Sequence, residues 1–327
     1  RCAAARDLAV GSLSAALLTE EGAYYEWSVL GEVGEARRDP DVPPAVRIAI
    51  GREHRCLLDG AGRVLCWGRS TVGALGQGAQ TLIERATPVP LPSHAVDLSV
   101  STQTSCAVLD DGVVYCWGSN RYRQLGRGDG GEGSQSGDPA PVEGVARAVR
   151  VAASPTHTCA LIATGEVLCW GAHRHSQLGD GPHTTSFGTT PVSPAGDLLR
   201  VFQIGVGLEW SCVIASSVYC WGEPASAPHR ALYVPLPTVI DAPASAERVS
   251  LGDEGHACFL DDGAVLCFAY DAADPFPTSA RAIRVPDLAD DVVDIEVGQA
   301  RACALHASGA VDCWAPNGAP ERVLGLP

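Results

Sequence analysis

The chain has 327 residues and a formal net charge of −15, from 38 acidic and 23 basic side chains. A surface this acidic disfavours nucleic acid and anionic membranes as partners, and the sequence has no apolar run of about 18 residues, the length that spans a bilayer. The hydrophobic share of 46% is ordinary for a packed domain.

One short segment recurs along the chain: two apolar stretches around a turn, closed by an aromatic residue. The clearest copy, at 105–118, reads SCAVLDDGVVYCWG. The copies span 14–27, 55–68, 105–118, 157–171, 211–222, 257–268 and 302–314. The first copy is degenerate and has Ala15 and Glu26 where cysteines would stand. A period of about 45–50 residues is typical of a repeat architecture.

A short alternating strand precedes each copy, and a Pro-marked strand follows it after a loop. The preceding strands, which we call A, are predicted at 5–11, 45–51, 95–101, 148–153, 199–205, 248–252 and 292–298. The copy itself supplies strands B and C. The Pro-marked D strands are predicted at 42–44, 88–92, 141–144, 191–194, 233–237, 283–286 and 322–327. Proline at D is expected, because an outer edge strand tolerates a missing N–H.

Four strands per copy, repeated radially, predict an all-β fold, a β-propeller of four-stranded antiparallel blades. We expect one domain, 1–327, in which each copy forms one blade. The predicted blade limits are 1–44, 45–92, 93–144, 145–194, 195–237, 238–286 and 287–327. Because the first copy begins with strand A and the last ends with strand D, we expect the ring to close without strand exchange.

Twelve of the 13 cysteines occur in pairs eight to ten residues apart, one in each of strands B and C. The pairs are Cys56 with Cys66, Cys106 with Cys116, Cys159 with Cys169, Cys212 with Cys220, Cys258 with Cys267, and Cys303 with Cys313. If each pair spans a hairpin, the sulfurs face each other at a spacing that suits a disulfide. Six disulfides indicate an oxidising compartment, so we expect a secreted, periplasmic or cell-surface protein. Buried free thiols and structural zinc are the alternatives; Cys2 is expected to be an unpaired thiol.

Three copies continue with a further phrase, ALGQG at 74–78, QLGRG at 124–128 and QLGDG at 177–181. The segment WGSNRYRQLGRG at 117–128 resembles the repeat of the regulator of chromosome condensation family, as does HTCALIATGEVLCWG at 157–171. The resemblance implies a seven-bladed propeller, and the cysteine-rich form is similar to the family's bacterial branch. Copies five to seven lack the QLG phrase.

The loops that join A to B and C to D open on one face of such a propeller, and they vary more than the B–C turns. Variable loops on a rigid scaffold tend to carry function, so we expect the binding site on this A–B/C–D face. One column, two residues before the first cysteine, would ring the face: Leu13, His54, Thr104, His157, Trp210, His256 and Arg301. Trp210 is predicted to be an exposed anchor, and the C–D loops add Tyr122 and His175.

The histidines of this column allow two interpretations. They could form a metal or acid/base site, or they could be repeat residues that hydrogen-bond within their own blades. The sequence contains no G-x-S-x-G, no phosphate-binding G-x-x-x-x-G-K and no H-E-x-x-H, so neither a catalytic site nor a cofactor is predicted.

The sequence therefore predicts a non-catalytic propeller that binds another macromolecule, a protein of unknown identity, through the A–B/C–D face. The family resemblance implies the same mode, since its members include exchange factors for a GTPase and a β-lactamase inhibitory protein. Two alternatives stay open. One is a lyase or hydrolase with a His/carboxylate site near the axis, and the other is a carbohydrate or cell-surface binder in which Trp210 stacks on a sugar.

Overall fold

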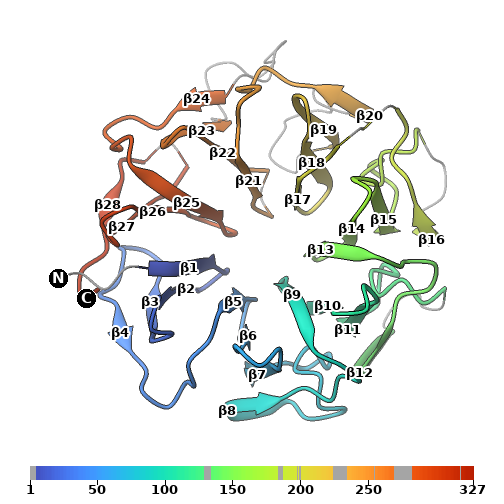
Figure 1. Cartoon of the computed structure of the whole chain (residues 1–327), viewed down its shortest axis with the longest axis horizontal. Helices are drawn as coiled ribbons and strands as arrows, with labels where there is room; N and C mark the ends of the chain where they lie inside the picture. The colour runs from blue at the N-terminus through green and yellow to red at the C-terminus, as the bar shows by residue number, and fades with distance from the viewer. Residues whose placement is uncertain are drawn as a thin grey trace.

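A computed structural model describes residues 5–128, 134–182, 187–196, 198, 200–223, 234–253, 255–268, 282–316 and 318–327. These ranges form seven four-stranded antiparallel sheets around one axis, a seven-bladed β-propeller (Figure 1). They contain no helix, and therefore none long and apolar enough to cross a membrane. The predicted fold class is confirmed. Cys2 lies outside the described residues.

Each blade is one continuous stretch of chain, with strand A at the axis and strand D at the rim (Figure 1). Blades 1 and 2 are β1 (Ala5–Val10), β2 (Ser14–Thr19), β3 (Tyr24–Ser28), β4 (Arg37–Arg38), β5 (Arg47–Ile50), β6 (His54–Leu58), β7 (Val64–Arg69) and β8 (Leu82–Pro88). Blades 3 and 4 are β9 (Ala95–Val100), β10 (Thr104–Leu109), β11 (Val114–Ser119), β12 (Gln135–Pro141), β13 (Ala148–Ala153), β14 (His157–Ile162), β15 (Val167–Ala172) and β16 (Phe187–Val192).

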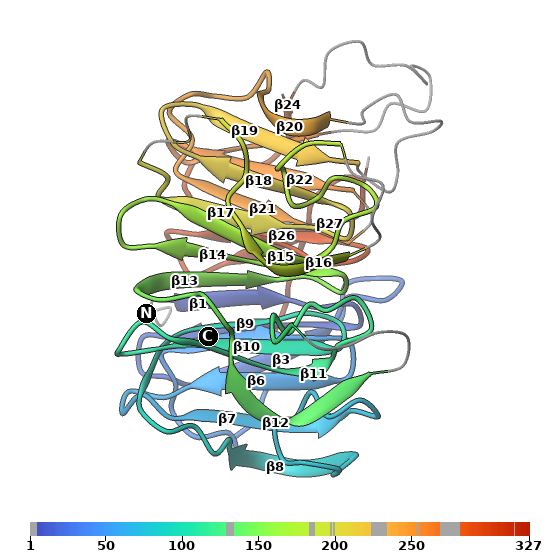
Figure 2. The ribbon, with the colours of Figure 1, turned by 90° about the vertical axis from the view of Figure 1, so that its right-hand side faces the viewer.

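The other three blades follow the same order. They are β17 (Gln203–Val206), β18 (Trp210–Ile214), β19 (Val218–Gly222), β20 (Val234–Val239), β21 (Arg248–Leu251), β22 (Ala257–Asp261), β23 (Ala264–Phe268), β24 (Ala282–Arg284), β25 (Val292–Val297), β26 (Ala302–His306), β27 (Val311–Trp314) and β28 (Glu321–Arg322). The strands run across the short dimension of the molecule (Figure 2). The predicted limit between residues 237 and 238 falls inside β20, which continues to Val239.

The B strands are buried along almost their whole length, polar residues included, because neighbouring blades cover both of their faces. All six residues of β10 are buried, and so are all six of β14. A tight turn closes each B–C hairpin: in blade 3, Leu109 N donates to Val113 O at 2.9 Å, and Gly112 has φ +80°, a conformation that glycine adopts without strain. The core is therefore a set of wedges between blades, and the contact between one blade and the next decides what is buried.

Several D strands differ from the prediction, because their Pro-marked segments come at the end of the strand or after it, whereas in blade 5 β20 contains residues 234–237 of the predicted strand. β8 is Leu82–Pro88 where 88–92 is predicted, and β12 is Gln135–Pro141 where 141–144 is predicted. The valine after the proline ends the pairing: Val89 N donates to Val64 O, and Val142 N to Val114 O, each at 2.8 Å. The proline thus stands where the chain leaves the sheet and its missing N–H does least harm.

Blade 1 has no disulfide, and its register corrects one prediction. Glu26 faces Ala16, while Ala15 faces Trp27, so Ala16 and not Ala15 occupies the position of the first cysteine. Glu26 instead accepts hydrogen bonds from Arg55 Nε of blade 2 at 3.0 and 3.2 Å, so an ion pair between blades occurs where other blades have a covalent link within the sheet.

The ring closes without strand exchange, as expected. β1–β4 form one complete sheet and β25–β28 another, and β1 lies beside β25 at the axis (Figure 1).

Candidate functional site

Each of the six predicted cysteine pairs lies directly opposed within one B–C hairpin, with Cα–Cα distances of 4.0–4.1 Å, and the predicted pairing is confirmed. The six bonds join Cys56 to Cys66, Cys106 to Cys116, Cys159 to Cys169, Cys212 to Cys220, Cys258 to Cys267, and Cys303 to Cys313.

Eleven of these twelve cysteines are buried in the core, whereas Cys267 is half-buried. The strand C partners Cys66, Cys169 and Cys313 are each 0% exposed. Because the sulfurs are bonded to one another, neither buried free thiols nor a zinc site accounts for these pairs. Each bond joins two strands of the same blade, so the disulfides stabilise single blades, and contact between blades must come from other residues.

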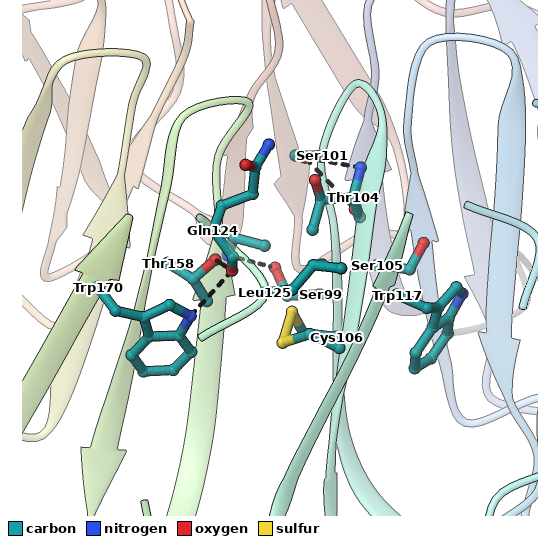
Figure 3. Close-up of a disulfide and its surroundings, with 12 residues drawn as sticks. Ser99, Ser101, Thr104, Ser105, Cys106, Trp117, Gln124, Leu125, Thr158 and Trp170 are labelled. Carbon is teal, nitrogen blue, oxygen red and sulfur yellow. Dashed lines mark hydrogen bonds between the residues drawn. A yellow bond between two sulfur atoms is a disulfide. The ribbon is translucent and has the colours of Figure 1, made fainter. Parts of the chain in front are cut away.

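The QLG phrase supplies that contact at three interfaces. Between blades 3 and 4, Gln124 O accepts hydrogen bonds from Trp170 Nε1 at 2.8 Å and Thr158 Oγ1 at 3.0 Å (Figure 3). The same arrangement recurs between blades 2 and 3 and between blades 4 and 5. The acceptors there are Ala74 O, bonded to Trp117 Nε1 and Ser105 Oγ, and Gln177 O, bonded to Trp221 Nε1 and Ser211 Oγ, all at 2.9–3.0 Å.

The Leu-Gly pair of the phrase fills the wedge beside the disulfide. Leu75, Leu125 and Leu178 are fully buried. Leu125 packs with Cys106, Cys116 and Val142, and with Trp170 of the next blade. Gly126 has φ +66°, and a Cβ there would lie 2.6 Å from Val142 Cγ1 and 2.8 Å from Trp170 Nε1, so only glycine lets the indole approach. We call this arrangement the Leu-Gly clasp.

Two histidines of the predicted column also join neighbouring blades. His54 Nε2 lies 3.1 Å from Ser105 Oγ, and His157 Nε2 lies 2.8 Å from Ser211 Oγ. Burial lowers the pKa of His54 to about 4 and that of His157 to about 3, so both rings are neutral at pH 7. Thr104 is fully buried as well. None of the three is on a binding face: the two histidines complete the packing between blades, and the Thr104 hydroxyl donates to Ser119 O of its own blade at 3.4 Å.

Trp210 is also buried, with 4% of its surface exposed, which makes the prediction of an exposed anchor wrong. Its ring centroid lies 6.4 Å from that of Phe268 in blade 6, and it packs with Cys212 and Cys220. Phe268 takes the place of the clasp tryptophan and has no N–H to donate. The interface between blades 5 and 6 is therefore filled by a large side chain of blade 5 itself.

Arg301 is 9% exposed and donates from Nη2 to Gly31 O, which joins blade 7 to blade 1. His256, Tyr122 and His175 are half-buried and remain accessible candidates. The Arg121 guanidinium lies 5.6 Å from the centre of the Tyr122 ring, a stacked cation–π geometry.

His175 is the predicted residue that meets carboxylates. Its Nδ1 lies 2.9 Å from Glu223 Oε2 and its Nε2 lies 3.3 Å from Glu209 Oε1. Burial, with the Glu223 carboxylate nearby, raises the pKa of Glu209. The three groups join the C–D loop of blade 4 to blade 5 on the predicted face. Among the residues placed in the structure, no group of three or more His, Cys, Asp or Glu is arranged to hold a metal ion.

A charged ring on the axis was not predicted. One position of every A strand contributes to it: Asp7, Arg47, Asp97, Arg150, Gln203, Arg248 and Asp294. Six of these residues line the axial channel, and the seventh, Asp294, is paired with one of them. The ring is tied by Arg47 Nη1–Asp97 Oδ1 at 2.7 Å and Arg248 Nε–Asp294 Oδ1 at 2.8 Å. An alignment of the seven A strands would have revealed the ring, because the charge at this one position alternates in sign from copy to copy.

Seven positions do not allow complete alternation. Gln203 separates two arginines, and Asp7 follows Asp294 around the ring. Burial raises the pKa of Asp7 to about 7, and burial together with neighbouring Asp294 raises that of Glu296 to about 7. No histidine is among the described residues that line the channel, so the His/carboxylate combination expected of an axial catalytic site is not formed there.

A cavity of about 370 Å³ lies between blades 6 and 7. Its walls include Cys258 and Cys267 of blade 6 and Trp314 of blade 7, and it reaches His256 and Arg301 at the ends of the A–B loops. The C–D connection of blade 7 also lines it, through Pro316 and Ala319. The cavity therefore extends to the face that carries the variable loops.

The opposite face carries an exposed apolar ring that was also missed. Its members are Val96 (53% exposed), Val149 (46%), Phe202 (47%) and Val293 (50%). Each precedes an axial ring residue, and Val96, Val149 and Val293 each stand at a break in the A–B pairing register. A β-bulge turns a side chain away from the sheet. The alternation of apolar and polar residues in the sequence does not reveal such a bulge, so these side chains were not predicted to be exposed.

The chain is similar to known repeat proteins. Two models described as regulator of chromosome condensation (RCC1) repeat match residues 111–161 and 95–124. The chain is 28% identical over 281 residues to the E3 ubiquitin-protein ligase HERC2 of Homo sapiens, covering 75% of this chain and 6% of that protein. It is 31% identical over 144 residues to the regulator of chromosome condensation of Drosophila melanogaster, covering 44% of this chain and 26% of that protein.

Among solved structures, Prp20p of Saccharomyces cerevisiae superposes with a TM-score of 0.72 at 20% identity, covering 89% of this chain and 80% of that chain. This likeness supports the fold alone. The chain spans only a small part of the curated relatives that it matches.

Proposed function

From the premise that this chain is an RCC1-like repeat propeller, we propose that it is a non-catalytic scaffold that binds another protein through its A–B/C–D face. The yeast relative Prp20p has binding properties to Gsp1p and histones, which supports protein binding as the mode. The net charge of −15 favours a protein with a basic surface over nucleic acid.

One observation carries the choice of face. Leu-Gly clasps fill three wedges, those between blades 2 and 3, blades 3 and 4, and blades 4 and 5. The wedge between blades 6 and 7 is instead a cavity that reaches the A–B and C–D loops. An apolar recess among variable loops is a site where a partner's side chain can bury apolar surface.

Mutations on the two faces test this choice. Once a partner has been isolated from the native source, its affinity is measured for Arg121→Ala and Tyr122→Ala, on the predicted face and away from the cavity. The matched control is Val149→Asp on the opposite face. We expect Arg121→Ala and Tyr122→Ala to weaken binding and Val149→Asp to leave it unchanged. Binding that is lost only with Val149→Asp would assign the exposed apolar ring as the interface.

We further propose that the protein works in an oxidising compartment, as a secreted, periplasmic or cell-surface protein. Six disulfides in one chain support this. Alkylation of the protein taken from its native source without reductant should label at most one of the 13 cysteines. Labelling of all of them would contradict the proposed compartment.

The carbohydrate hypothesis loses the residue on which it rested. A stacking platform must offer the face of its ring to the ligand, and Trp210 is packed against Phe268 with only 4% of its surface exposed.

A further inference from the structure

The cavity between blades 6 and 7 occupies the same place in the repeat as the wedge filled by Leu125. That leucine belongs to one buried apolar cluster with Cys106 and Cys116 of its own blade, Val142 after strand D, and Trp170 of the next blade. At the interface between blades 6 and 7 the equivalent residues all line the cavity: Cys258, Cys267, Val285 and Trp314.

The floor and walls of the two sites are alike in chemistry. Val285 is 6% exposed and Trp314 is 5% exposed, and Val297 of β25 adds a further apolar wall. The indole N–H of Trp314 corresponds to the donor that Trp170 offers to Gln124 O at 2.8 Å. One difference lies at Ala302, which stands where blade 4 has Thr158, so the second donor of the clasp is absent here.

The sequence of blade 6 does not provide a clasp. The connection from its strand C to its strand D, residues 269–281, contains neither leucine nor glycine. Elsewhere in the ring the same wedge selects a Leu-Gly pair three times, at 75–76, 125–126 and 178–179. The three clasps therefore show what such a wedge binds. It takes a leucine side chain, a following glycine that packs against the indole, and the carbonyl of the residue before the leucine, which accepts the indole N–H.

We propose that the cavity between blades 6 and 7 is a recognition site for a Leu-Gly turn of a partner protein, which completes the ring in trans as the chain's own loops do elsewhere. This rests on the proposed function and specifies the partner's chemistry. The partner's leucine packs beside the Cys258–Cys267 disulfide, and the carbonyl before it accepts from Trp314 Nε1. Burial of one leucine side chain accounts for the selectivity.

The chain supplies its own probe. A synthetic peptide of residues 120–128, NRYRQLGRG, is added to the full-length protein labelled with 15N at tryptophan, and the indole resonances are followed. We expect saturable shifts of the Trp314 resonance. The control peptide carries Leu125→Ser and should bind at least about tenfold more weakly, as expected for loss of a buried leucine.

Two protein variants complete the design. Ala302→Leu fills the cavity and should abolish the Trp314 shifts, whereas Val293→Leu enlarges an exposed residue of β25 and should leave them unchanged. Thermal unfolding of both variants establishes that they are folded.

Several results would overturn the proposal: equal binding of the two peptides, no Trp314 shift at millimolar peptide, or binding that survives Ala302→Leu. If replacing Phe276 of the 269–281 connection by alanine shifts the Trp314 resonance in the absence of peptide, the chain itself fills the site and the proposal is wrong. If Ala302→Leu abolishes self-association, the occupant is a second copy. Loss of partner affinity in Tyr122→Ala but not in Ala302→Leu would leave the proposed function standing and remove this site.

Discussion

Between blades 3 and 4, Leu125 and Gly126 fill the space beside the Cys106–Cys116 disulfide, whereas between blades 6 and 7 the same space beside Cys258–Cys267 is a cavity of about 370 Å³. The two hairpins have the same fold and the same covalent link. They differ in what the neighbouring loop provides. A disulfide within a blade therefore does not determine how well that blade packs against the next one.

The comparison extends around the ring. Blades 2 to 5 form a clasped arc, joined by three copies of the Leu-Gly clasp. The rest is an unclasped arc with four junctions. Three of them have their own contacts: Trp210 against Phe268, Arg301 bound to Gly31 O, and Glu26 paired with Arg55. The fourth, between blades 6 and 7, contains the cavity. The clasped arc keeps the repeated contact between blades, and the unclasped arc does not. The unclasped arc can therefore carry a surface that is specific to one partner.

The largest effect is expected at Trp210, which substitutes for a clasp between blades 5 and 6. Trp210→Ala should lower the free energy of unfolding by about 3–5 kcal/mol, because it empties a large volume between two blades. Urea denaturation followed by circular dichroism measures it. A change below about 0.5 kcal/mol, typical of surface sites, would mean that this junction does not depend on the indole.

A matched pair of substitutions sharpens the contrast between the arcs. Leu125→Ala should cost about 2–5 kcal/mol, because the leucine is fully buried in a filled wedge. Ile283→Ala, at the rim of the cavity where the side chain is 55% exposed, should cost no more than about 0.5 kcal/mol. Equal costs in urea denaturation would contradict the distinction between clasped and open wedges.

The disulfides should differ in accessibility although their loops are alike. Closure of a loop of about ten residues contributes roughly 2.5–3 kcal/mol in the chain-entropy model, whichever blade it lies in. Cys106 and Cys116 are fully buried, whereas Cys267 is half-buried and lines the cavity. Limited reduction followed by alkylation and mass spectrometry should therefore open Cys258–Cys267 first. Simultaneous reduction of both bonds would indicate a closed wedge.

The two arcs should respond to pH in opposite directions. His54 and His157, in the clasped arc, have pKa values lowered to about 4 and about 3, so the unfolded chain binds more protons and stability is lost as pH falls below about 6.5. Asp7 and Glu296, where blades 7 and 1 meet at the axis, have pKa values raised to about 7. There the folded state holds the protons, and stability is lost as pH rises from about 4 through about 7.

The windows overlap between about pH 4 and 6.5, so the carboxylates act alone above that range. From pH 6 to pH 8 the unfolding free energy should fall by about 1 kcal/mol for each carboxylate. Glu296→Gln should reduce this fall, and His157→Gln should reduce the loss below pH 5. Urea midpoints at pH 4, 6 and 8 test both, and a rise in stability from pH 6 to 8 would contradict the assignment.

The sequence was sufficient to predict the presence of the A, B and C strands and all six cysteine pairs, because both features repeat in nearly every copy with little change. The A strand of blade 5 was predicted to begin at residue 199 and begins at Gln203. The D strands of blades 2 and 3 were misplaced, since a proline marks the end of the pairing and the preceding residues of β8 and β12 carry no apolar alternation. The D strand of blade 5 was predicted to within two residues. The sequence pattern predicts the strand to which a residue belongs. It does not predict which residues of the next blade that strand contacts, because those residues are distant in the sequence.

The candidate site was harder to predict for this reason. Trp210 reads as exposed because it replaces a histidine in a short loop, yet its position depends on Phe268, 58 residues later. The clue was available: Phe268 is the one phenylalanine in the column of tryptophans, and it follows a blade without the QLG phrase. The axial charges were missed because each copy contributes one residue to a ring of seven.

The measurement that tests the unequal interfaces most directly is a crystal structure under xenon pressure, since xenon enters dry apolar cavities. We predict a bound xenon atom beside Trp314, Val285 and Val297, and none beside Leu75, Leu125 or Leu178. Xenon at all of these wedges, or at none, would contradict the account.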